Sequence, residues 1–238
     1  MNHVEPTSAR VALVTAASRG IGAACARQLA AEGYEVALMA RSEQVLSVAE
    51  EVGGLAVRGD LTEQPDIARL IDTVGERWGR LDVLVNNAGD PPKGDPLTLP
   101  DAAWRDSFEL LFMSALRLSR AAVPLLRAAD GGAIVNISAA DGLEPHLMFP
   151  IGGSMRAALS ALTKLLARRL AADRIRVNSV LPWVVLDAAS EWRSEEIPMS
   201  RAATHDEVAR VVSFLCSPAG SYLTGVNLPI DGGWSRRL

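Results

Sequence analysis

The chain has 238 residues, of which 49% are hydrophobic and 22% charged, so it can bury one large core within a single domain. Its formal net charge of -4 provides no basic face for nucleic acid, and no apolar stretch is long enough to span a bilayer. The first residues lack the apolar core of a signal peptide, and Cys25 and Cys216 lie in apolar helical patterns. We therefore expect a cytoplasmic protein with two buried thiols, no nucleic-acid partner and no membrane partner.

The first predicted element is a strand that runs from Arg10 to Thr15 and ends in a turn of small residues, Ala16 to Gly22. An Ala-rich helical pattern begins directly afterwards, at Ala23. Such a turn lets backbone N–H groups approach a pyrophosphate at the positive end of a helix. An ordinary strand-to-helix connection is the alternative interpretation of this motif taken alone.

Strand-like apolar runs then alternate with helical patterns along the rest of the chain. The runs are Glu35–Ala40, Leu55–Arg58, Leu81–Val85, Ala133–Ile137, Ile175–Val180 and Asn227–Ile230. Each is almost continuously apolar, as expected when both faces of a sheet are covered by helices. The pattern predicts an α/β fold with a Rossmann-like, doubly wound parallel sheet, formed by one domain over residues 1–238.

Ordered motifs along almost the whole chain resemble those of the short-chain dehydrogenase/reductase family. Thr15 to Gly22 is similar to the family's glycine-rich turn, and Asp60-Leu61 resembles the pair whose Asp holds the adenine. Asn86 to Gly89 reads Asn-Asn-Ala-Gly, as in the family after the fourth strand. Further matches are Arg176 to Pro182, Thr224-Gly225 and Asp231-Gly232-Gly233. The cofactor-binding residues that the resemblance implies are Thr15, Ser18, Arg19, Gly20, Ile21, Gly22, Arg41, Asp60, Leu61, Asn87, Ala88 and Gly89.

The residues after the second strand predict which dinucleotide binds. The chain reads Ala40-Arg41-Ser42, without the acidic residue that hydrogen-bonds the adenosine ribose of NAD. Arg41 is placed to meet a 2′-phosphate, and Arg19 could clamp its other side, since guanidinium groups match phosphate geometry. We therefore expect NADP(H); the alternative is that both arginines are solvated surface charges.

Four positions depart from the family's catalytic set of Asn, Ser, Tyr and Lys. The strand that ends in Ile137-Ser138 puts the Ser position on Ala139, the Tyr position on Gly152 and the Lys position on Arg156. The sequence Arg156 to Leu159 matches the family's Lys-Ala-Ala-Leu and supports this register. Leu111 stands at the Asn position, where the helical spacing of its apolar neighbours indicates packing. Shifting the register by one residue would make Ser138 the family's Ser, but strand alternation argues against that.

The family's route of proton transfer is therefore not available to this sequence. Gly152 has no side chain, and Arg156 keeps a positive charge for the nicotinamide ribose or an anionic substrate but is a poor proton donor. The two tyrosines, Tyr34 and Tyr222, do not lie on this helix face. The candidate acids or bases that remain are Arg156, Ser138 and His146, with Asp141 and Glu144 in the same loop as His146. A solvated side chain is the alternative for His146.

Further departures lie near the expected nicotinamide and in the glycine turn. Trp183 replaces a family Gly and either fills part of the nicotinamide pocket or turns outward, and Asp187 stands where the family has Thr. Residues 187–200 correspond to the family's substrate lid and offer Trp192 and Arg193 as contacts. Ala16 replaces the first glycine of the turn, a mild change if its φ is negative.

Three functions remain compatible with the sequence. The first is an NADP-linked oxidoreductase with a divergent site, the second a non-redox cyclase, isomerase or dehydratase, and the third a catalytically silent partner subunit.

His3, His146 and His205 lack metal-ligand spacing, so no metal is expected. The resemblance implies a homodimer or homotetramer that pairs through Trp104–Arg127 and Pro150–Ala172. The second of these segments carries a small, apolar stripe, Ala157, Ala158, Ala161, Leu162 and Leu165.

Overall fold

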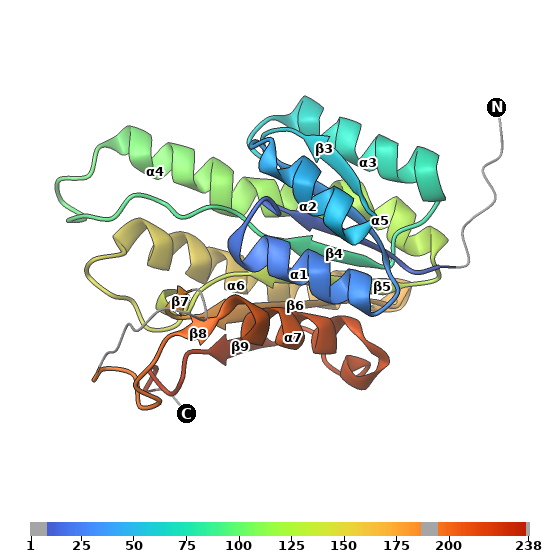
Figure 1. The fold of residues 1–238 in the computed structure, drawn as a ribbon. Helices are drawn as coiled ribbons and strands as arrows, with labels where there is room; N and C mark the ends of the chain where they lie inside the picture. The colour runs from blue at the N-terminus through green and yellow to red at the C-terminus, as the bar shows by residue number, and fades with distance from the viewer. Residues whose placement is uncertain (1–8, 187–194, 237–238) are drawn as a thin grey trace.

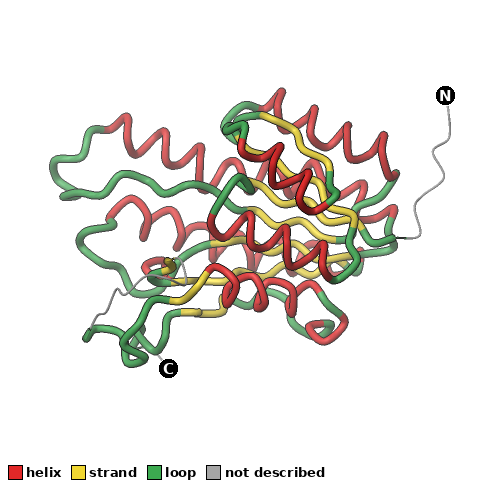
Figure 2. The backbone as a smooth tube through the Cα atoms, in the orientation of Figure 1, coloured by secondary structure: helices red, strands yellow, loops and turns green. Residues whose placement is uncertain are grey.

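The computed structural model describes residues 9–186 and 195–236. Within these ranges, parallel strands form a seven-stranded sheet in the order β3-β2-β1-β4-β5-β6-β9. Helices cover both of its faces (Figures 1 and 2). The predicted doubly wound fold is therefore confirmed. The strands of the sheet are β1 (Val11–Thr15), β2 (Glu35–Ala40), β3 (Leu55–Arg58), β4 (Val83–Asn86), β5 (Gly132–Ile137), β6 (Ile175–Pro182) and β9 (Asn227–Ile230).

Two helical layers enclose the sheet, each with its own hydrophobic cluster. Helices α1 (Gly20–Ala31), α2 (Gln44–Val52) and α7 (His205–Cys216) pack on the face that is in front in Figure 1. The opposite face is covered by α3 (Gln64–Trp78), α5 (Ser114–Ala128) and α6 (Pro150–Leu170). Because strands are covered on both sides, their side chains are apolar in either direction, which explains the unbroken apolar runs.

The helix predicted to contain Trp104 begins earlier than that residue and is not regular. Helix α4 (Asp101–Phe108) passes into a π-helical turn, Glu109–Met113, which continues into α5. Single π-helical turns inside α-helices are frequent at functional sites. This turn carries Leu111, the residue at the family's Asn position.

A small strand pair stands apart from the main sheet. Strands β7 (Val185–Leu186) and β8 (Ala203–Thr204) pair in parallel, and the sequence did not predict them. Thr204 then caps α7 through a capping box in which its side chain and that of Glu207 accept each other's backbone N–H groups. The pair thereby fixes where α7 begins beside the carboxyl ends of the main strands.

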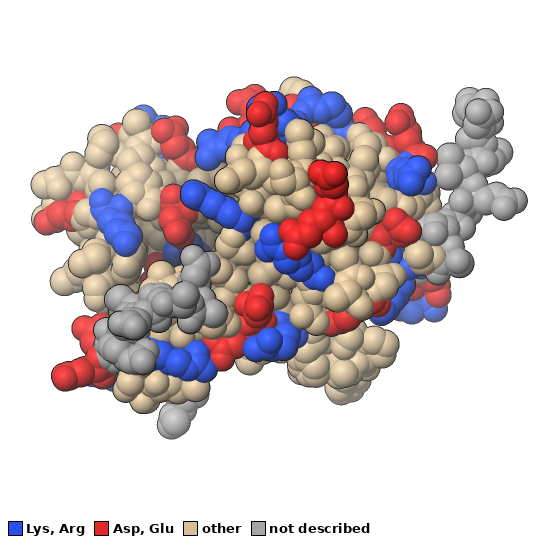
Figure 3. All heavy atoms as spheres, viewed as in Figure 1, with Lys and Arg blue, Asp and Glu red and all other residues tan. Residues whose placement is uncertain are grey.

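The surface carries charges of both signs. On the face drawn in Figure 3, Lys and Arg side chains are interspersed with Asp and Glu, and no broad area of one sign appears.

Among the residues described, no helix has the length and apolar character needed to cross a membrane. Cys25 and Cys216 are buried free thiols, as expected, and burial raises the pKa of Cys216 to about 12.

Candidate active site

A cavity of about 1010 Å³ lies at the carboxyl ends of the strands. It spans β1 and β4, neighbouring strands whose following helices cover opposite faces of the sheet. In open α/β sheets ligands bind at such a switch point. The cavity is lined by eleven of the twelve predicted cofactor residues: Thr15, Ser18, Arg19, Gly20, Ile21, Arg41, Asp60, Leu61, Asn87, Ala88 and Gly89. Gly22 packs beneath the turn instead.

The glycine-rich turn has the backbone shape that a phosphate site needs. Gly20 adopts a φ of +58°, and a Cβ atom added at Gly22 would lie 2.5 Å from the carbonyl oxygen of Ala16. Position 20 therefore favours glycine, and position 22 requires it. Ala16 adopts a φ of 47°, so the expectation that its change from Gly is mild at negative φ does not apply. A left-handed conformation costs a non-glycine residue about 1 kcal/mol.

Hydrogen bonds join the ends of β1 and β4 beneath the turn. Thr15 Oγ1 donates to the carbonyl oxygen of Asn87 at 2.7 Å and accepts from the Asn87 backbone N–H at 3.0 Å. Asn87 Nδ2 donates to the carbonyl oxygen of Ala16 at 3.3 Å. Thr15, the first residue of the glycine-rich turn, is thus joined by hydrogen bonds to the Asn86 to Gly89 motif. These bonds hold the two motifs together at the floor of the cavity.

The far end of the cavity is open and basic. The Arg41 side chain is 75% exposed and lies 3.6 Å from Asp60 Oδ2, while Asp60 Oδ1 accepts hydrogen bonds from the backbone and hydroxyl of Thr62. Arg19 is exposed and precedes α1. No carboxylate follows directly on β2, where the chain continues with Arg41 and Ser42. Two guanidinium groups therefore border this end, as predicted for a phosphate.

At the opposite end, three of the four positions predicted to correspond to the family's catalytic residues line the cavity: Leu111, Ala139 and Arg156. Leu111 and Ala139 are both buried and face it, and neither has a polar side chain. Gly152 lies in the first turn of α6, and Arg156 one turn further on. The predicted register is consistent with this placement, because Gly152 lies directly behind Asp141 and Arg156, which also line the cavity.

The space next to Gly152 is filled by an ion pair. A Cβ atom added at Gly152 would lie 3.0 Å from Asp141 Oδ2 and 3.1 Å from Arg156 Nη1. Arg156 Nη1 donates to Asp141 Oδ2 at 3.5 Å, and Nη2 donates to Asp90 Oδ1 at 3.0 Å. The guanidinium group is therefore shared between two carboxylates at the root of the space that a tyrosine side chain would enter.

Asp141 is the most buried acid of this region, with 1% of its surface exposed. Burial raises the pKa of its carboxyl group, although the charge and hydrogen bond of Arg156 oppose the shift. Its Oδ1 atom has no hydrogen-bond partner among the described residues. A buried carboxyl oxygen without a partner is unfavourable unless the group carries a proton or meets a ligand.

The other predicted acid or base candidates lie in different surroundings. Ser138 is buried and lines the cavity together with Ala139, so strand alternation does not remove it from the site, and its hydroxyl has no described partner. His146 is not among the lining residues; its Nδ1 accepts the Met148 backbone N–H at 3.2 Å. Glu144 also lies outside the lining and accepts the backbone N–H of Arg236.

Aromatic side chains form a wall at this end. Trp183 stacks on Trp234 with ring centroids 3.8 Å apart, and Phe149 meets the Trp183 ring edge-on at 5.6 Å. The His146 ring lies 5.8 Å from Trp183. The Trp183 indole thus packs against the C-terminal segment and also lines the cavity. It therefore has a feature of each expected position, because it packs on another segment and still borders the expected nicotinamide pocket.

Neither tyrosine is near the cavity. Tyr34 is buried in the core beside α1, and Tyr222 is fully exposed; neither lines the cavity.

Asp187, Trp192 and Arg193 lie outside the described residues. No group of His, Cys, Asp and Glu suited to a metal ion occurs among the residues that are described.

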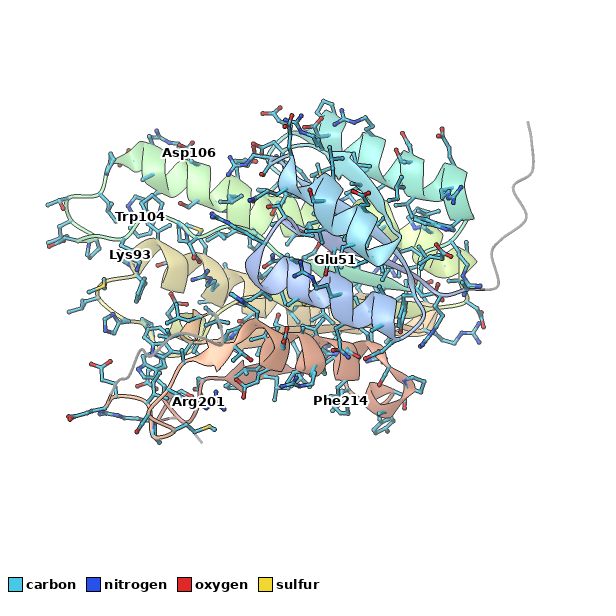
Figure 4. All side chains as sticks on the ribbon, viewed as in Figure 1. Glu51, Lys93, Trp104, Asp106, Arg201 and Phe214 are labelled. Atoms are coloured by element: carbon cyan, nitrogen blue, oxygen red, sulfur yellow. The ribbon has the colours of Figure 1, made fainter. Side chains whose placement is uncertain are left out.

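Two cavity residues were not singled out from the sequence as site residues. His205 begins α7 and lines the cavity, with its Nε2 atom 3.6 Å from the place of a Cβ at Gly20. Lys93 follows β4 and is labelled in Figure 4. It lines the cavity, and its ammonium group lies 4.9 Å from the centre of the Phe149 ring. The spacing of 185 positions between Gly20 and His205 gives no local signal of their contact.

Comparisons with known proteins agree with this geometry. A family model described as enoyl-(acyl carrier protein) reductase matches residues 15–235. The cis-4-hydroxycyclohexanecarboxylate dehydrogenase of Sinomonas cyclohexanicum is 35% identical over 97% of this chain and 98% of its own length. Human dehydrogenase/reductase SDR family member 4 is 32% identical over 100% of this chain and 92% of its own.

Solved structures give the same result. L-sorbose reductase of Gluconobacter frateurii, complexed with NADPH and L-sorbose, has a TM-score of 0.90 at 32% identity over 98% of this chain and 99% of that one. Acetoin dehydrogenase of Enterobacter cloacae has a TM-score of 0.90 at 31% identity, with the same coverage. The chain therefore belongs to the short-chain dehydrogenase/reductase family.

Proposed function

We propose that the protein is an NADP(H)-dependent oxidoreductase that interconverts a carbonyl group and an alcohol. The observation that carries this proposal is the cavity itself, which runs without interruption from the two arginines, over the glycine turn, to the buried polar groups beside Gly152. When bound, the dinucleotide supplies or accepts the hydride. The residues of this chain bind and orient it, and they border the place where the substrate must lie.

The cavity fits a dinucleotide on three counts. The turn at Gly20 and Gly22 keeps the backbone free of side chains beside the N-terminus of α1, where the helix dipole favours a pyrophosphate. Asn87, Ala88 and Gly89 line the middle of the cavity, and the chain from Pro182 to Leu186 borders its substrate end.

The preference for the 2′-phosphate follows from charge. Arg41 and Arg19 border the adenosine end, and Arg41 is restrained there by Asp60 at 3.6 Å. A guanidinium group that meets a phosphate forms charge-assisted hydrogen bonds, each of which contributes about 1.5–3 kcal/mol. The NADPH named for the sorbose reductase structure agrees with this preference.

The other two functions draw no support from the comparisons. The relatives and structures described above carry the names of dehydrogenases and reductases. A silent subunit would also have no need of the glycine conformations and hydrogen bonds that keep the cofactor half intact. What differs from the family is the source of the proton, because no phenol lines the cavity.

Titration of purified protein with NADPH and NADH, followed by nucleotide fluorescence, tests the proposal. We expect NADPH to bind more tightly, and Arg41→Asp to weaken NADPH binding by about 10- to 100-fold, the equivalent of one charged hydrogen bond. Arg58→Asp is the matched control, since Arg58 pairs with Glu43 outside the cavity. Absence of NADPH binding, or equal affinities for the two nucleotides in both proteins, would contradict the proposal.

The substrate class is addressed with the compounds named for the relatives. Acetoin, L-sorbose and cis-4-hydroxycyclohexanecarboxylate differ in size and charge, and each is offered with NADPH or NADP⁺ as its oxidation state requires. Because apolar and aromatic side chains such as Phe149 and Trp183 border the substrate end, we expect the less polar compounds to react better than the sugar.

We further propose that the protein acts in the cytoplasm as a homodimer or homotetramer. The stripe on α6 is exposed at Ala157, Ala158 and Ala161, and Leu165 is 65% exposed, so a close-packing helix face has no cover in the single chain. Light scattering at micromolar concentration should give an oligomer, and Leu165→Glu should lower its mass. The free thiols of Cys25 and Cys216 fit a reducing compartment.

A further inference from the structure

Gly152, Asp141 and Arg156 form one structural unit. The family's tyrosine side chain would begin where the Gly152 Cβ would lie, 3.0 Å from Asp141 Oδ2 and 3.1 Å from Arg156 Nη1. A larger residue at position 152 would displace both groups, so the loss of the phenol and the presence of the ion pair are linked. A charged pair has therefore replaced a phenol and its lysine at the same point of the cavity wall.

Asp141 is held in a manner unlike that of a structural ion pair. Its contact with Arg156 is long, 3.5 Å, whereas Arg156 donates to the 87%-exposed Asp90 at 3.0 Å. Asp141 Oδ1 is buried and has no partner among the described residues, yet the residue lines the cavity. The shorter contact of the cation is thus with the exposed carboxylate, and the buried carboxylate keeps an oxygen available to a ligand.

We propose that Asp141 is the proton source that takes the place of the family's tyrosine, with Arg156 stabilising the carboxylate that remains. This inference rests on the proposed function and adds the group that completes it. The carboxyl group lines the cavity at the root of the space that a tyrosine side chain would enter, so its proton passes to the substrate oxygen through water in the cavity.

The chemical step balances with these groups. In reduction the carbonyl carbon takes a hydride and its oxygen takes a proton, so that C=O becomes CH–OH. The O–H bond of Asp141 breaks as a water O–H bond forms, and that water gives its own proton to the carbonyl oxygen. Asp141 is left as a carboxylate beside Arg156 and regains a proton from solvent. Oxidation of the alcohol runs through the same transfers in reverse.

Other side chains of this wall are less suited to the role. A guanidinium group does not release its proton near neutral pH, which excludes Arg156 as the donor. The Ser138 hydroxyl is a far weaker acid than a carboxyl group. His146 lies outside the cavity lining, where it accepts a backbone hydrogen bond.

The first test measures binding and reduction separately. NADPH affinity is measured by fluorescence, and kcat is measured with two activated diketones, 2,3-butanedione and 9,10-phenanthrenequinone. We expect Asp141→Asn to leave the NADPH Kd unchanged and to lower kcat by about 10²–10⁴-fold, the usual contribution of general acid catalysis. Glu144→Gln is the matched control in the same loop and should keep both values, because Glu144 lies outside the cavity lining.

A pH series distinguishes a proton source from a structural role. The groups facing Asp141 are Arg156 on α6 and Asp90 after β4, and the Asp90 charge raises the Asp141 pKa while Arg156 lowers it. Reduction needs the protonated acid, so kcat should fall as pH rises through this pKa. Asp90→Asn should shift that fall to lower pH, and Arg156→Met should shift it to higher pH. These shifts do not depend on the folding of an Asp141 variant.

Chemical rescue supplies a final measurement. Added formate should restore reduction by Asp141→Ala, because the small acid can enter the space that the side chain leaves. A failure of the wild type to bind NADPH would refute the proposed function itself. NADPH binding without reduction of either diketone, full activity in Asp141→Asn, or unshifted profiles in the Asp90 and Arg156 variants would overturn only the role of Asp141.

Discussion

The two ends of the cavity differ in how far they keep the family's design. At the cofactor end, the glycine turn, the bonds between Thr15 and Asn87, and Asp60 all stand at the family's positions. At the substrate end, the sequence predicts Leu111, Ala139, Gly152 and Arg156 at the four positions of the family's proton-transfer set. The function that we propose therefore separates the residues that bind a hydride carrier from the residue that delivers a proton. In this proposal the cofactor end follows the family, and the acid at the substrate end is a different residue.

The strongest test of this difference between the two ends is to restore the family's Ser, Tyr and Lys at the substrate end. A variant with Ala139→Ser, Gly152→Tyr and Arg156→Lys still carries Asp141, whose Oδ2 would lie 3.0 Å from the new Cβ. We expect this triple variant to be poorly packed and nearly inactive. Adding Asp141→Val, which removes the carboxylate, should raise kcat for 2,3-butanedione by about 10²-fold or more, as expected for a working general acid.

The indole at the family's Gly position gives this experiment an internal control. Trp183→Gly is added to the four changes to determine whether the stack on Trp234 narrows the path to the hydride. A gain that appears only with Trp183→Gly would assign the barrier to the indole. If the triple and four-change variants have equal kcat, Asp141 does not compete with a phenol, and the explanation of the missing tyrosine is wrong.

A smaller effect is expected from disturbing the cofactor end. Gly22→Ala would place a Cβ atom 2.5 Å from the Ala16 oxygen and 2.7 Å from Asn87 Nδ2, so the bond joining β1 to β4 must shift. We expect a loss of about 1–3 kcal/mol in unfolding free energy, as for overpacked core sites, together with weaker NADPH binding. Urea unfolding and nucleotide fluorescence measure the two.

A second glycine shows whether crowding is the cause. A Cβ at Gly75, within α3, would meet Leu125 Cδ2 at an ordinary 3.5 Å. Gly75→Ala should therefore stabilise the protein by about 0.5–1 kcal/mol through helix propensity. Equal effects of the two substitutions would contradict the view that the turn is closely fitted.

The first turn of α7 takes part in an ion pair that makes the stability of the fold depend on pH. Glu207 receives two hydrogen bonds from Arg201 and one from the Thr204 backbone, and these lower its pKa to about 2. A lowered carboxyl pKa stabilises the fold above the unfolded value and loses that effect as pH falls through the folded value. Because the pair is partly exposed, we expect Glu207→Gln to cost about 1 kcal/mol at pH 7.

The pH dependence gives this prediction its control. The difference in unfolding free energy between wild type and Glu207→Gln should be full at pH 7, shrink below the unfolded value near pH 4.5 and vanish near pH 2. Urea unfolding at several pH values measures it. A difference that is constant with pH would show that the side-chain shape, and not the charge, caps α7.

The sequence predicts the fold well, and it selects cofactor-end residues that line one cavity, because the evidence is local. The turn from Thr15 to Gly22 and the Asn86 to Gly89 motif each form from consecutive residues whose backbone shape depends on residue type. Alternating elements with short connections then indicate a parallel, doubly wound sheet. The count from Trp104 put the family's Asn position on Leu111, which lines the cavity, but gave no sign of the π-helical turn that carries it.

The chemistry of the substrate end was less predictable because it depends on which side chains occupy the space beside Gly152. Asp141 was a candidate acid among three in its loop, and nothing local separated it from Glu144 or His146. Its contact with Gly152 needs the crossing of the loop over α6. The stack of Trp183 on Trp234 likewise joins two segments that the chain separates widely. Packing between distant elements, not residue type, decides these roles.

The smallest expected effect concerns Ala16, a position with a strained backbone at the cofactor end. Ala16 adopts a φ of 47°, which suits glycine, so Ala16→Gly relieves about 1 kcal/mol of backbone strain. The added glycine also gains about 0.4–1 kcal/mol of freedom in the unfolded chain, which offsets most of that relief. We expect urea unfolding to show a stabilisation below about 1 kcal/mol, against a loss of roughly 1 kcal/mol for Ala30→Gly in α1, where the backbone is helical. The two alanine-to-glycine changes should thus have opposite signs. A loss of the same size at both positions would show that Ala16 is not strained and that this end departs from the family at no energetic cost.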